Sequence, residues 1–347
     1  MKNMICKIVT ALLLLFIFLQ SYTNQLYGLE VKKLGTSAAA FLRIPVGAKG
    51  IAMGSAFTAI ADDGSAVFWN PGNITVITQP SFLVHHSPWL PGLQYNYVNC
   101  IVPIPRVGVI GINITSLTTE EMDVTTPENP MGTGETFTAG SNAIGFAFAR
   151  RLTDRFSIGA NLKYIQERIY HSTARGFAFD VATMFITPFR DVRLGVNISN
   201  IGTNLRMRGE DLNTYVDVAP SQEGNNDNIV SELKTDYYSL PITMRIGLSR
   251  DWWLSRDTRF TLACDGVNPS DNAQSLDIGF DFTTFRGLVS LRGGFNELFL
   301  KDREKGLTLG AGLKIPATKD FCMTVSYAYQ DFKYLGSVNH LTLEITF

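Results

Sequence analysis

Long apolar runs are almost absent from this chain of 347 residues. Beyond residue 30, no apolar stretch approaches the roughly 20 residues that a membrane-spanning helix needs. The one long run lies near the N-terminus, where Lys2 and Lys7 precede the apolar residues 8–19. This pattern is typical of a secretory signal peptide, and we expect cleavage within residues 23–28. An exported chain without spanning helices is secreted, periplasmic or a β-barrel of the outer membrane.

Cysteine and histidine are scarce, with four residues of each type. Cys6 precedes the apolar run and the other three cysteines lie in predicted strands, so neither a lipid anchor nor a disulfide framework is expected. His85 and His86 are adjacent in a predicted strand and point to opposite faces, which argues against a shared metal ion. A hydrolase triad needs a histidine near a serine and an acid, but there is no G-x-S-x-G motif, and we interpret His340 as a solvated loop residue. We therefore expect no enzyme activity, no metal site and no cofactor.

Net charge is also small, because 30 Lys and Arg residues nearly balance 31 Asp and Glu residues. Nucleic acid is therefore not an expected partner. Acidic residues gather in two predicted loops, 118–137 and 204–236. Such loops are either soluble surface or a docking surface for a partner, and the sequence leaves both alternatives open.

From Ser81 onward, the chain repeats a unit of about ten residues that alternate in size and polarity, followed by a break. In one such unit, Ile144 and Phe146 alternate with Gly145 and Ala147. This pattern is typical of transmembrane barrel strands, which turn one face to lipid and the other to the lumen. We predict about fourteen strands, an even number as in bacterial barrels. They lie at residues 81–87, 95–104, 107–117, 138–151, 156–170, 175–187, 192–199, 240–249, 259–267, 273–282, 288–296, 306–315, 321–329 and 338–347.

The breaks between these strands alternate between long and short. Residues 118–137 and 200–239 are long breaks, whereas 105–106 and 152–155 are tight. Long outer loops and short periplasmic turns produce this alternation in outer-membrane barrels, and only the link at 250–258 departs from it. The sequence thus predicts an all-β fold, an up-and-down antiparallel transmembrane barrel over residues 81–347.

Residues 29–80 have a different composition, rich in Gly, Ala and Ser. This region has too few large side chains to build its own core, and its small residues allow close approach to a wall. We predict that it folds into the barrel lumen as a plug. Within it, Ser65 is expected to cap a short helix over 66–69, and Asn70-Pro71 to end that helix.

Two adjacent carboxylates of this region, Asp62 and Asp63, need partners if they are buried. An isolated buried charge is costly, so a carboxylate among apolar residues should be paired. Arg245 and Arg292, both on predicted inward faces, are the candidate partners in a latch between plug and wall. A capping turn without any switching role is the alternative that the sequence leaves open.

Several short motifs in this region resemble the N-terminal signature of the PorV/PorQ family. They are Ile44, Met53-Gly54, Ala56-Phe57, Ala61-Asp62-Asp63, Ser65-Ala66 and Trp69-Asn70-Pro71. Members of that family are outer-membrane barrels similar to the FadL long-chain fatty-acid transporters, whose N-terminal hatch also carries an Asn-Pro-Ala turn. Gly72 and Asn73 depart from the resemblance, because they stand where the family usually has Ala-Gly.

The resemblance implies two functions, and both stay open, with transport slightly ahead. Similarity to FadL implies a transporter in which a hydrophobic compound binds above the plug and leaves through the wall. Similarity to PorV implies a component of type IX secretion that receives exported cargo proteins at its outer loops. The residues expected to form the plug and line a ligand route are Phe41, Leu42, Ile51, Met53, Phe57, Ile60, Phe68, Trp69, Asn70 and Pro71.

The C-terminal strand and the aromatic residues point to the outer membrane. Leu341, Leu343, Ile345 and the terminal Phe347 occupy alternate positions, and this ending resembles the recognition signal of the barrel-assembly machinery. Outer-membrane lipid and that machinery are therefore the expected partners. Aromatic residues at strand ends fit an interfacial girdle, namely Trp89, Tyr95, Tyr97, Tyr164, Tyr170, Trp252, Trp253, Tyr327 and Tyr329.

Overall fold

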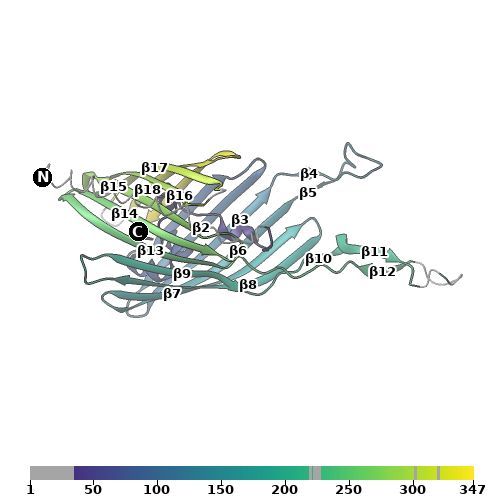
Figure 1. The fold of residues 1–347 in the computed structure, drawn as a ribbon, viewed down its shortest axis with the longest axis horizontal. Helices are drawn as coiled ribbons and strands as arrows, with labels where there is room; N and C mark the ends of the chain where they lie inside the picture. Colours follow the sequence, from purple (N-terminus) through teal and green to yellow (C-terminus); the bar gives the residue numbers. More distant parts are fainter. Residues whose placement is uncertain (1–34, 219–220, 222–227, 301–302, 319–320) are drawn as a thin grey trace. The chain divides into compact units, whose positions relative to one another are not determined.

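The computed structural model describes residues 35–218, 221, 228–300, 303–318 and 321–347. The predicted signal peptide and its cleavage site lie outside these residues. Within them, fourteen long strands form one sheet (Figure 1). These are β1 (Ser81–Pro88), β2 (Leu93–Ile104), β3 (Gly108–Thr119), β6 (Ala139–Thr153), β7 (Phe156–Ile169), β8 (Ser172–Ile186), β9 (Arg193–Gly202), β13 (Thr243–Ser255), β14 (Thr258–Pro269), β15 (Ser275–Thr284), β16 (Val289–Leu298), β17 (Lys305–Pro316), β18 (Cys322–Phe332) and β19 (Gly336–Thr346).

Every long strand pairs antiparallel with the strand before it and the strand after it. The first and last strands also pair, with Ser81 opposite Thr346 and His86 opposite Leu341. The sheet is therefore closed, which satisfies backbone hydrogen bonds that an open edge would leave free. The predicted barrel of fourteen antiparallel strands is confirmed.

The alternation in the sequence separates an outer face from an inner face. Phe146 is 52% exposed, whereas the next residue, Ala147, is fully buried, and Phe177 and Ala178 show the same contrast. Successive side chains of a strand point to opposite faces. Large apolar residues therefore cover the outside, and small residues face the lumen.

The connections lie at two ends of the barrel. One end is called the turn end here and carries the connections 105–107, 154–155, 187–192, 256–257 and 285–288 and the C-terminal residue. The other is called the loop end and carries the connections 89–92, 120–138, 170–171, 203–242 and 270–274. The link predicted at 250–258 is shorter than expected, because β13 continues to Ser255 and β14 begins at Thr258. This link is therefore a tight turn, whereas the two-residue connection 170–171 at the loop end and the six-residue connection 187–192 at the turn end depart from a strict alternation of long loops and tight turns.

The two long loops contain short strands that the sequence analysis did not predict. Loop 120–138 carries a hairpin of β4 (Met122–Asp123) and β5 (Thr136–Phe137). The second loop carries β10 (Arg208–Gly209), which pairs with β8, and η3 (Glu210–Leu212). It also carries a separate hairpin of β11 (Asn213–Val216) and β12 (Ile229–Glu232).

Short helices occupy the residues before β1. They are η1 (Ala40–Arg43), α2 (Ala48–Ala52), α3 (Ala66–Trp69) and η2 (Pro71–Val76), and a further turn, η4 (Phe285–Gly287), joins β15 to β16. The helix predicted over 66–69 is confirmed. None of the helices in the described parts of the chain combines the length and hydropathy needed to cross a bilayer.

Candidate functional site: the lumen and the segment within it

The N-terminal segment, residues 35–80, runs inside the ring of strands from the loop end to the turn end. Near its start, the amide of Ala38 donates to the carbonyl of Ser239 at 3.0 Å. Toward its end, the amide of Gly64 donates to Glu344 near the end of β19 at 2.7 Å. Helix α2 contacts β16 to β19, whereas η2 contacts β3, β6, β7 and β8. Because these strands lie on different sides of the barrel, the segment occupies the interior.

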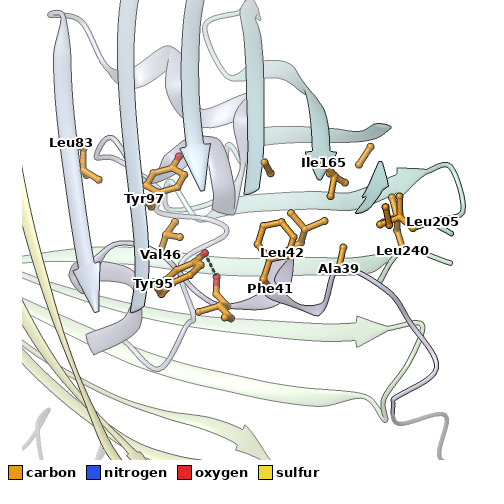
Figure 2. Packing of buried hydrophobic residues seen from close by; sticks show 14 residues of the cluster. Ala39, Phe41, Leu42, Val46, Leu83, Tyr95, Tyr97, Ile165, Leu205 and Leu240 are labelled. Carbon is orange, nitrogen blue, oxygen red and sulfur yellow. Dashed lines mark hydrogen bonds between the residues drawn. The ribbon is translucent and has the colours of Figure 1, made fainter. Parts of the chain in front are cut away.

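Apolar side chains of this segment divide among three buried clusters. The loop-end cluster combines residues of the segment with Leu205 and Leu240 from the long second loop (Figure 2). In Figure 2, the hydroxyl of Tyr95 donates to the carbonyl of Ile44 at 3.0 Å. The predicted plug residues fall into these clusters: Phe41 and Leu42 in the loop-end cluster; Met53, Phe57, Ile60 and Trp69 in the second; and Ile51 in the third. Phe68 is half-buried against the first two clusters.

Trp69 is the largest fully buried side chain of the segment. Its ring meets those of Phe57 and Phe68 edge to face, with centroids 6.0 and 5.1 Å apart. Its indole N–H donates to the carbonyl of Val46 at 2.9 Å, and the guanidinium of Arg245 lies 5.2 Å from the ring centroid. One side chain thus joins three parts of the segment to the wall.

The Asn-Pro turn after α3 is fixed by the side chain of Asn70. Its carbonyl oxygen accepts from the amide of Gly72 at 3.0 Å, and its amide group donates to the carbonyls of Thr58 at 2.9 Å and Thr183 at 3.1 Å. Asn70 therefore ends the helix, as predicted, and also attaches the turn to β8. The start of α3 differs from the prediction, because Ser65 makes no capping bond with its side chain; Asp63 instead accepts from the amide of Ser65 at 2.9 Å.

Glycines on the inner wall let the backbone of the segment touch the backbone of the strands. A Cβ atom on Gly279 would overlap the carbonyl of Met53, and one on Gly294 would overlap the amide of Gly54. On the opposite side, a Cβ atom on Gly159 would overlap the carbonyl of Pro71. These positions require glycine because no space remains for a side chain.

Carboxylates of the wall fasten the segment through its backbone. Asp265 of β14 is fully buried and accepts from the amides of Phe57 at 3.0 Å and Thr58 at 2.9 Å. At the loop end, Asp271 accepts from Arg43 at 2.5 Å and from Ser37 at 2.6 Å. Sequence reasoning missed these residues, although a signal was present. That signal is the inward strand position of Asp265, because a buried unpaired charge is costly; Asp271 lies in the connection between β14 and β15 and carries no such signal.

The structure places the four latch candidates differently from the prediction. Asp62 forms its ion pair with Lys49 of α2, at 2.5 Å, and Arg292 pairs with Asp281 at 2.9 Å. Arg245 lies 4.0 Å from Asp277 and contacts Trp69. Among the described residues, no ion pair joins Asp62 or Asp63 to Arg245 or Arg292. A single cavity does bring Asp62, Asp63 and Arg292 together, whereas Arg245 lines other spaces nearer the loop end.

That cavity, with a volume of about 240 Å³, lies at the turn end between the segment and the wall. It is called the turn-end cavity here. Each of its lining residues is polar, charged or glycine. They are Lys49, Asp62, Asp63, Arg259, Thr283, Gly287, Ser290, Arg292, Gly312, Lys314, Thr324, Ser326, Thr342 and Glu344.

The electrostatics of the segment favour ionised Asp62. Burial by itself raises the pKa of this carboxyl, but Lys49, Arg259 and Arg193 together lower it to about 2. Burial raises the pKa of the neighbouring Asp63, and the charge of Asp62 adds to this effect. The adjacent carboxylates therefore differ in their readiness to accept a proton, because the lysine bonds directly to only one of them.

A buried polar layer lies on the inner face of β7, β8 and β9. Lys163 of β7 pairs with Asp180 of β8 at 2.8 Å and donates to Asn200 at 2.5 Å. Asn161 donates to Asp180 at 3.2 Å. Each of these four side chains is buried. An apolar molecule that moved straight along the lumen would have to pass these charges.

Two expectations about ring side chains need correction. His340 is not a solvated loop residue, because it is fully buried on the inner face of β19 and stacks on His85 with centroids 5.6 Å apart. Tyr95 and Tyr97 do not belong to an interfacial girdle, because both are buried in the lumen. In each case the strand was predicted, but the face on which the side chain lies was not. The prediction that His85 and His86 point to opposite faces is confirmed, since only His85 is buried.

The residues of the predicted assembly signal lie on the outer face of the barrel. Leu341 and Phe347 are 51% and 53% exposed, and Leu343 and Ile345 lie on the same face of β19. Cys100, Cys264 and Cys322 are free thiols. In the described part of the chain, no three His, Cys, Asp or Glu side chains are arranged to hold a metal ion.

No family model and no curated protein matches the sequence of this chain. Membership of the PorV/PorQ family therefore stays a prediction. The fold, by contrast, matches solved structures over nearly its whole length.

Three solved structures illustrate the match. The chain is similar to the CymD monoaromatic hydrocarbon channel, with 12% identity, a TM-score of 0.55 and coverage of 87% of this chain and 97% of that chain. It is similar to the Ralstonia pickettii toluene transporter TbuX, with 12% identity, a TM-score of 0.51 and coverage of 86% and 97%. It is also similar to a Pseudomonas aeruginosa FadL homologue, with 11% identity, a TM-score of 0.50 and coverage of 88% and 98%. At such low identity the likeness concerns the fold, which is the FadL-type barrel.

Proposed function

We propose that this chain is an outer-membrane channel that takes up hydrophobic compounds, with residues 35–80 acting as a plug. The observation that carries the proposal is the loop-end cluster. It gathers apolar side chains from the segment, the wall and the long second loop at the end where the loops lie. With outward loops, as in bacterial barrels, this is the first apolar environment that a compound from outside would meet.

The barrel fold supports this proposal. Solved structures with the same fold are described as a hydrocarbon channel, a toluene transporter and a FadL homologue. The outward face of large apolar residues suits contact with lipid. The alternative function, a component of type IX secretion that receives cargo, has no observation that favours it over transport.

In the proposed mechanism, a compound enters by displacing side chains of the segment. Phe41 and Leu42 are buried in the loop-end cluster, next to Leu240 of the second loop. Their apolar contacts are non-directional, so an apolar ligand can replace them with little loss of free energy. The polar layer around Lys163 and Asp180 then opposes further movement along the lumen, because an apolar molecule cannot satisfy those groups. The segment must therefore shift before a compound passes.

A crosslink between the segment and the loop tests the proposal. Ser37 and Ser239 form a bridge, so the double variant Ser37→Cys, Ser239→Cys can hold the segment in place. We expect oxidised cells to take up radiolabelled toluene or oleate at the background rate, and uptake to return after reduction. The matched control is Thr214→Cys, Ser231→Cys, which crosslinks the β11–β12 hairpin without touching the segment. Equal uptake by cells with and without the wild-type protein would overturn the proposal.

A further inference from the structure

The turn-end cavity differs in chemistry from the rest of the lumen. Its volume of about 240 Å³ is many times the roughly 10–15 Å³ that a cavity needs to hold one water molecule. None of its lining residues is apolar. A hydrophobic compound would meet charged and hydroxyl groups that it cannot satisfy, so uptake of such compounds does not account for this space.

The charges of the cavity are divided between its two sides. The wall contributes three cations, Arg259, Arg292 and Lys314, from strands β14, β16 and β17. The segment contributes the adjacent carboxylates Asp62 and Asp63, with Lys49 beside them. The one wall carboxylate in the lining, Glu344, is already bound to the amide of Gly64. On the wall, Arg259 pairs with Asp251 at 3.9 Å and with Asp281 at 3.6 Å, and Arg292 pairs with Asp281. Lys314 is therefore the wall cation of the lining that faces the carboxylates of the segment without an ion-pair partner among the described residues.

On the wall side of the cavity, the guanidinium of Arg292 is held in a fixed position. The guanidinium of Arg292 donates to Asp281 at 2.9 Å and to Ser326 at 3.2 Å, and its side chain is 5% exposed. Gly312 leaves the room that this guanidinium needs, because a Cβ atom there would lie 2.8 Å from its nitrogens. Hydroxyl groups surround the cations, from Thr283, Ser290 and Thr324. The cation is thus fixed in position with donors and acceptors beside it.

One charged side chain on each side of the cavity, Lys314 on the wall and Asp63 on the segment, is available to pair with a ligand. Lys314 is exposed near the turn end, and within the described residues it has no ion-pair partner. Asp63 accepts only from Ser65 and likewise has no ion-pair partner in that part of the chain. Lys314 also shows that the cavity reaches solvent at the turn end. A solute can therefore enter from the periplasmic side without passing the apolar clusters.

We propose that the turn-end cavity is a binding site for small zwitterionic solutes that enter from the periplasm. The anionic group would lie toward Arg292 and Lys314, and the cationic group toward Asp62 and Asp63. A molecule with both charges gains on both sides, whereas a simple anion or cation is repelled by one side. This site is independent of the uptake of hydrophobic compounds, because it uses other residues and another entrance.

Direct binding of a probe to the full-length protein in detergent tests the site. Glycine betaine is the zwitterion; choline, acetate and glycerol carry only its cationic group, only its anionic group, or neither. Ligand-observed saturation-transfer NMR measures each dissociation constant. We expect saturable binding of betaine, at least about five-fold tighter than the other three probes, which corresponds to about 1 kcal/mol, the contribution of one well-placed exposed ion pair. Binding should also weaken as salt is raised, because the field is screened.

Two variants and one control locate the binding. Lys314→Glu reverses an exposed wall charge, and Asp63→Asn removes a segment charge while it keeps the acceptor for Ser65. Each should raise the dissociation constant of betaine at least about five-fold. Lys333→Glu, at the loop end, is the matched control and should change nothing. Betaine that binds no better than glycerol, or equally well to wild type and Lys314→Glu, would overturn the proposal. Because Lys314 is exposed, that variant should still fold.

Discussion

The N-terminal segment meets the barrel wall in two contrasting ways. At Gly279 and Gly294 its backbone touches the backbone of the strands, with no space for a side chain. At Lys49, Asp62 and Asp63 it stands away from the wall and leaves a cavity of about 240 Å³. The same segment is thus closely packed on one side and borders a polar cavity on another. Residue size decides the difference, because contact follows inward glycines and the gap follows inward Arg, Lys and hydroxyl side chains.

Trp69→Ala, on the closely packed side of the segment, should lower the free energy of opening the segment more than any other variant proposed here. The change removes two aromatic contacts and the hydrogen bond to Val46 from a fully buried position. We expect the free energy of opening the segment to fall by about 3–5 kcal/mol, as for other buried Trp to Ala changes. Hydrogen exchange of the amides of residues 47–60 measures that free energy. Trp253→Ala is the control, since Trp253 is 68% exposed, and it should change the value by no more than about 0.5 kcal/mol.

Gly279→Ala should have a smaller effect than Trp69→Ala, in the same range as Asp265→Ala, because it adds a methyl group where backbone meets backbone. The new Cβ atom would overlap the carbonyl of Met53, so the segment has to move. We expect a loss of about 1–3 kcal/mol in the free energy of opening the segment, the range for overpacking. The same exchange measurement applies. Gly266→Ala on the adjacent strand is the control, because its nearest neighbour, the carbonyl of Ile246, lies 3.9 Å away; similar losses for both variants would contradict the prediction.

Asp265→Ala tests whether wall carboxylates fasten the segment. The change leaves the buried amides of Phe57 and Thr58 without their acceptor. We expect a loss of about 1.5–3 kcal/mol, the value of hydrogen bonds to a charged group, with exchange fastest at these two amides. Asp257→Ala removes an exposed ion pair with Arg286 at the turn end and is the control. Its effect should stay below about 1 kcal/mol, and protection of residues 57 and 58 should not change.

The smallest expected effect is the loss of the ion pair between Asp62 and Lys49, beside the turn-end cavity, at low pH. The folded-state pKa of Asp62, about 2, lies below its ordinary value of 3.8. Its ion pair with Lys49 therefore contributes fully above pH 4, and this contribution is lost as the pH falls through about 2. Wild type and Asp62→Asn should differ by a constant amount in segment opening between pH 7 and pH 5. The difference should shrink only below pH 4; a difference that disappears by pH 5 would show that Asp62 is not ionised by its neighbours.

The barrel could be predicted from the sequence because its signal is repeated. Ile144 and Phe146 alternate with Gly145 and Ala147, and similar units recur until Phe347. Lipid and lumen impose opposite demands on the two faces of each strand, so every strand reports the same fold independently. The strands within the loops, such as β11 and β12, have no such environment and were missed.

The interior was harder to predict, because pairing across the lumen is not a local property. The charges Asp62 and Arg292 were recognised as needing partners, but the partners turned out to be Lys49 and Asp281. Sequence spacing does not say which inward positions of distant strands lie at the same height. The buried ring of His340 was misassigned for a related reason, since alternation places a residue on a face but does not tell lumen from lipid for a lone polar ring.

The path of the segment has a consequence for how the molecule is assembled. The segment continues directly into β1, and β1 closes the ring by pairing with β19, the last strand of the chain. It also touches strands on different sides of the lumen, including β8 and β17. Threading it into a finished ring would mean pulling Trp69 and its neighbours past side chains already in contact. We therefore expect the ring to close around a segment that is already seated, so that the segment serves as the template on which the strands meet.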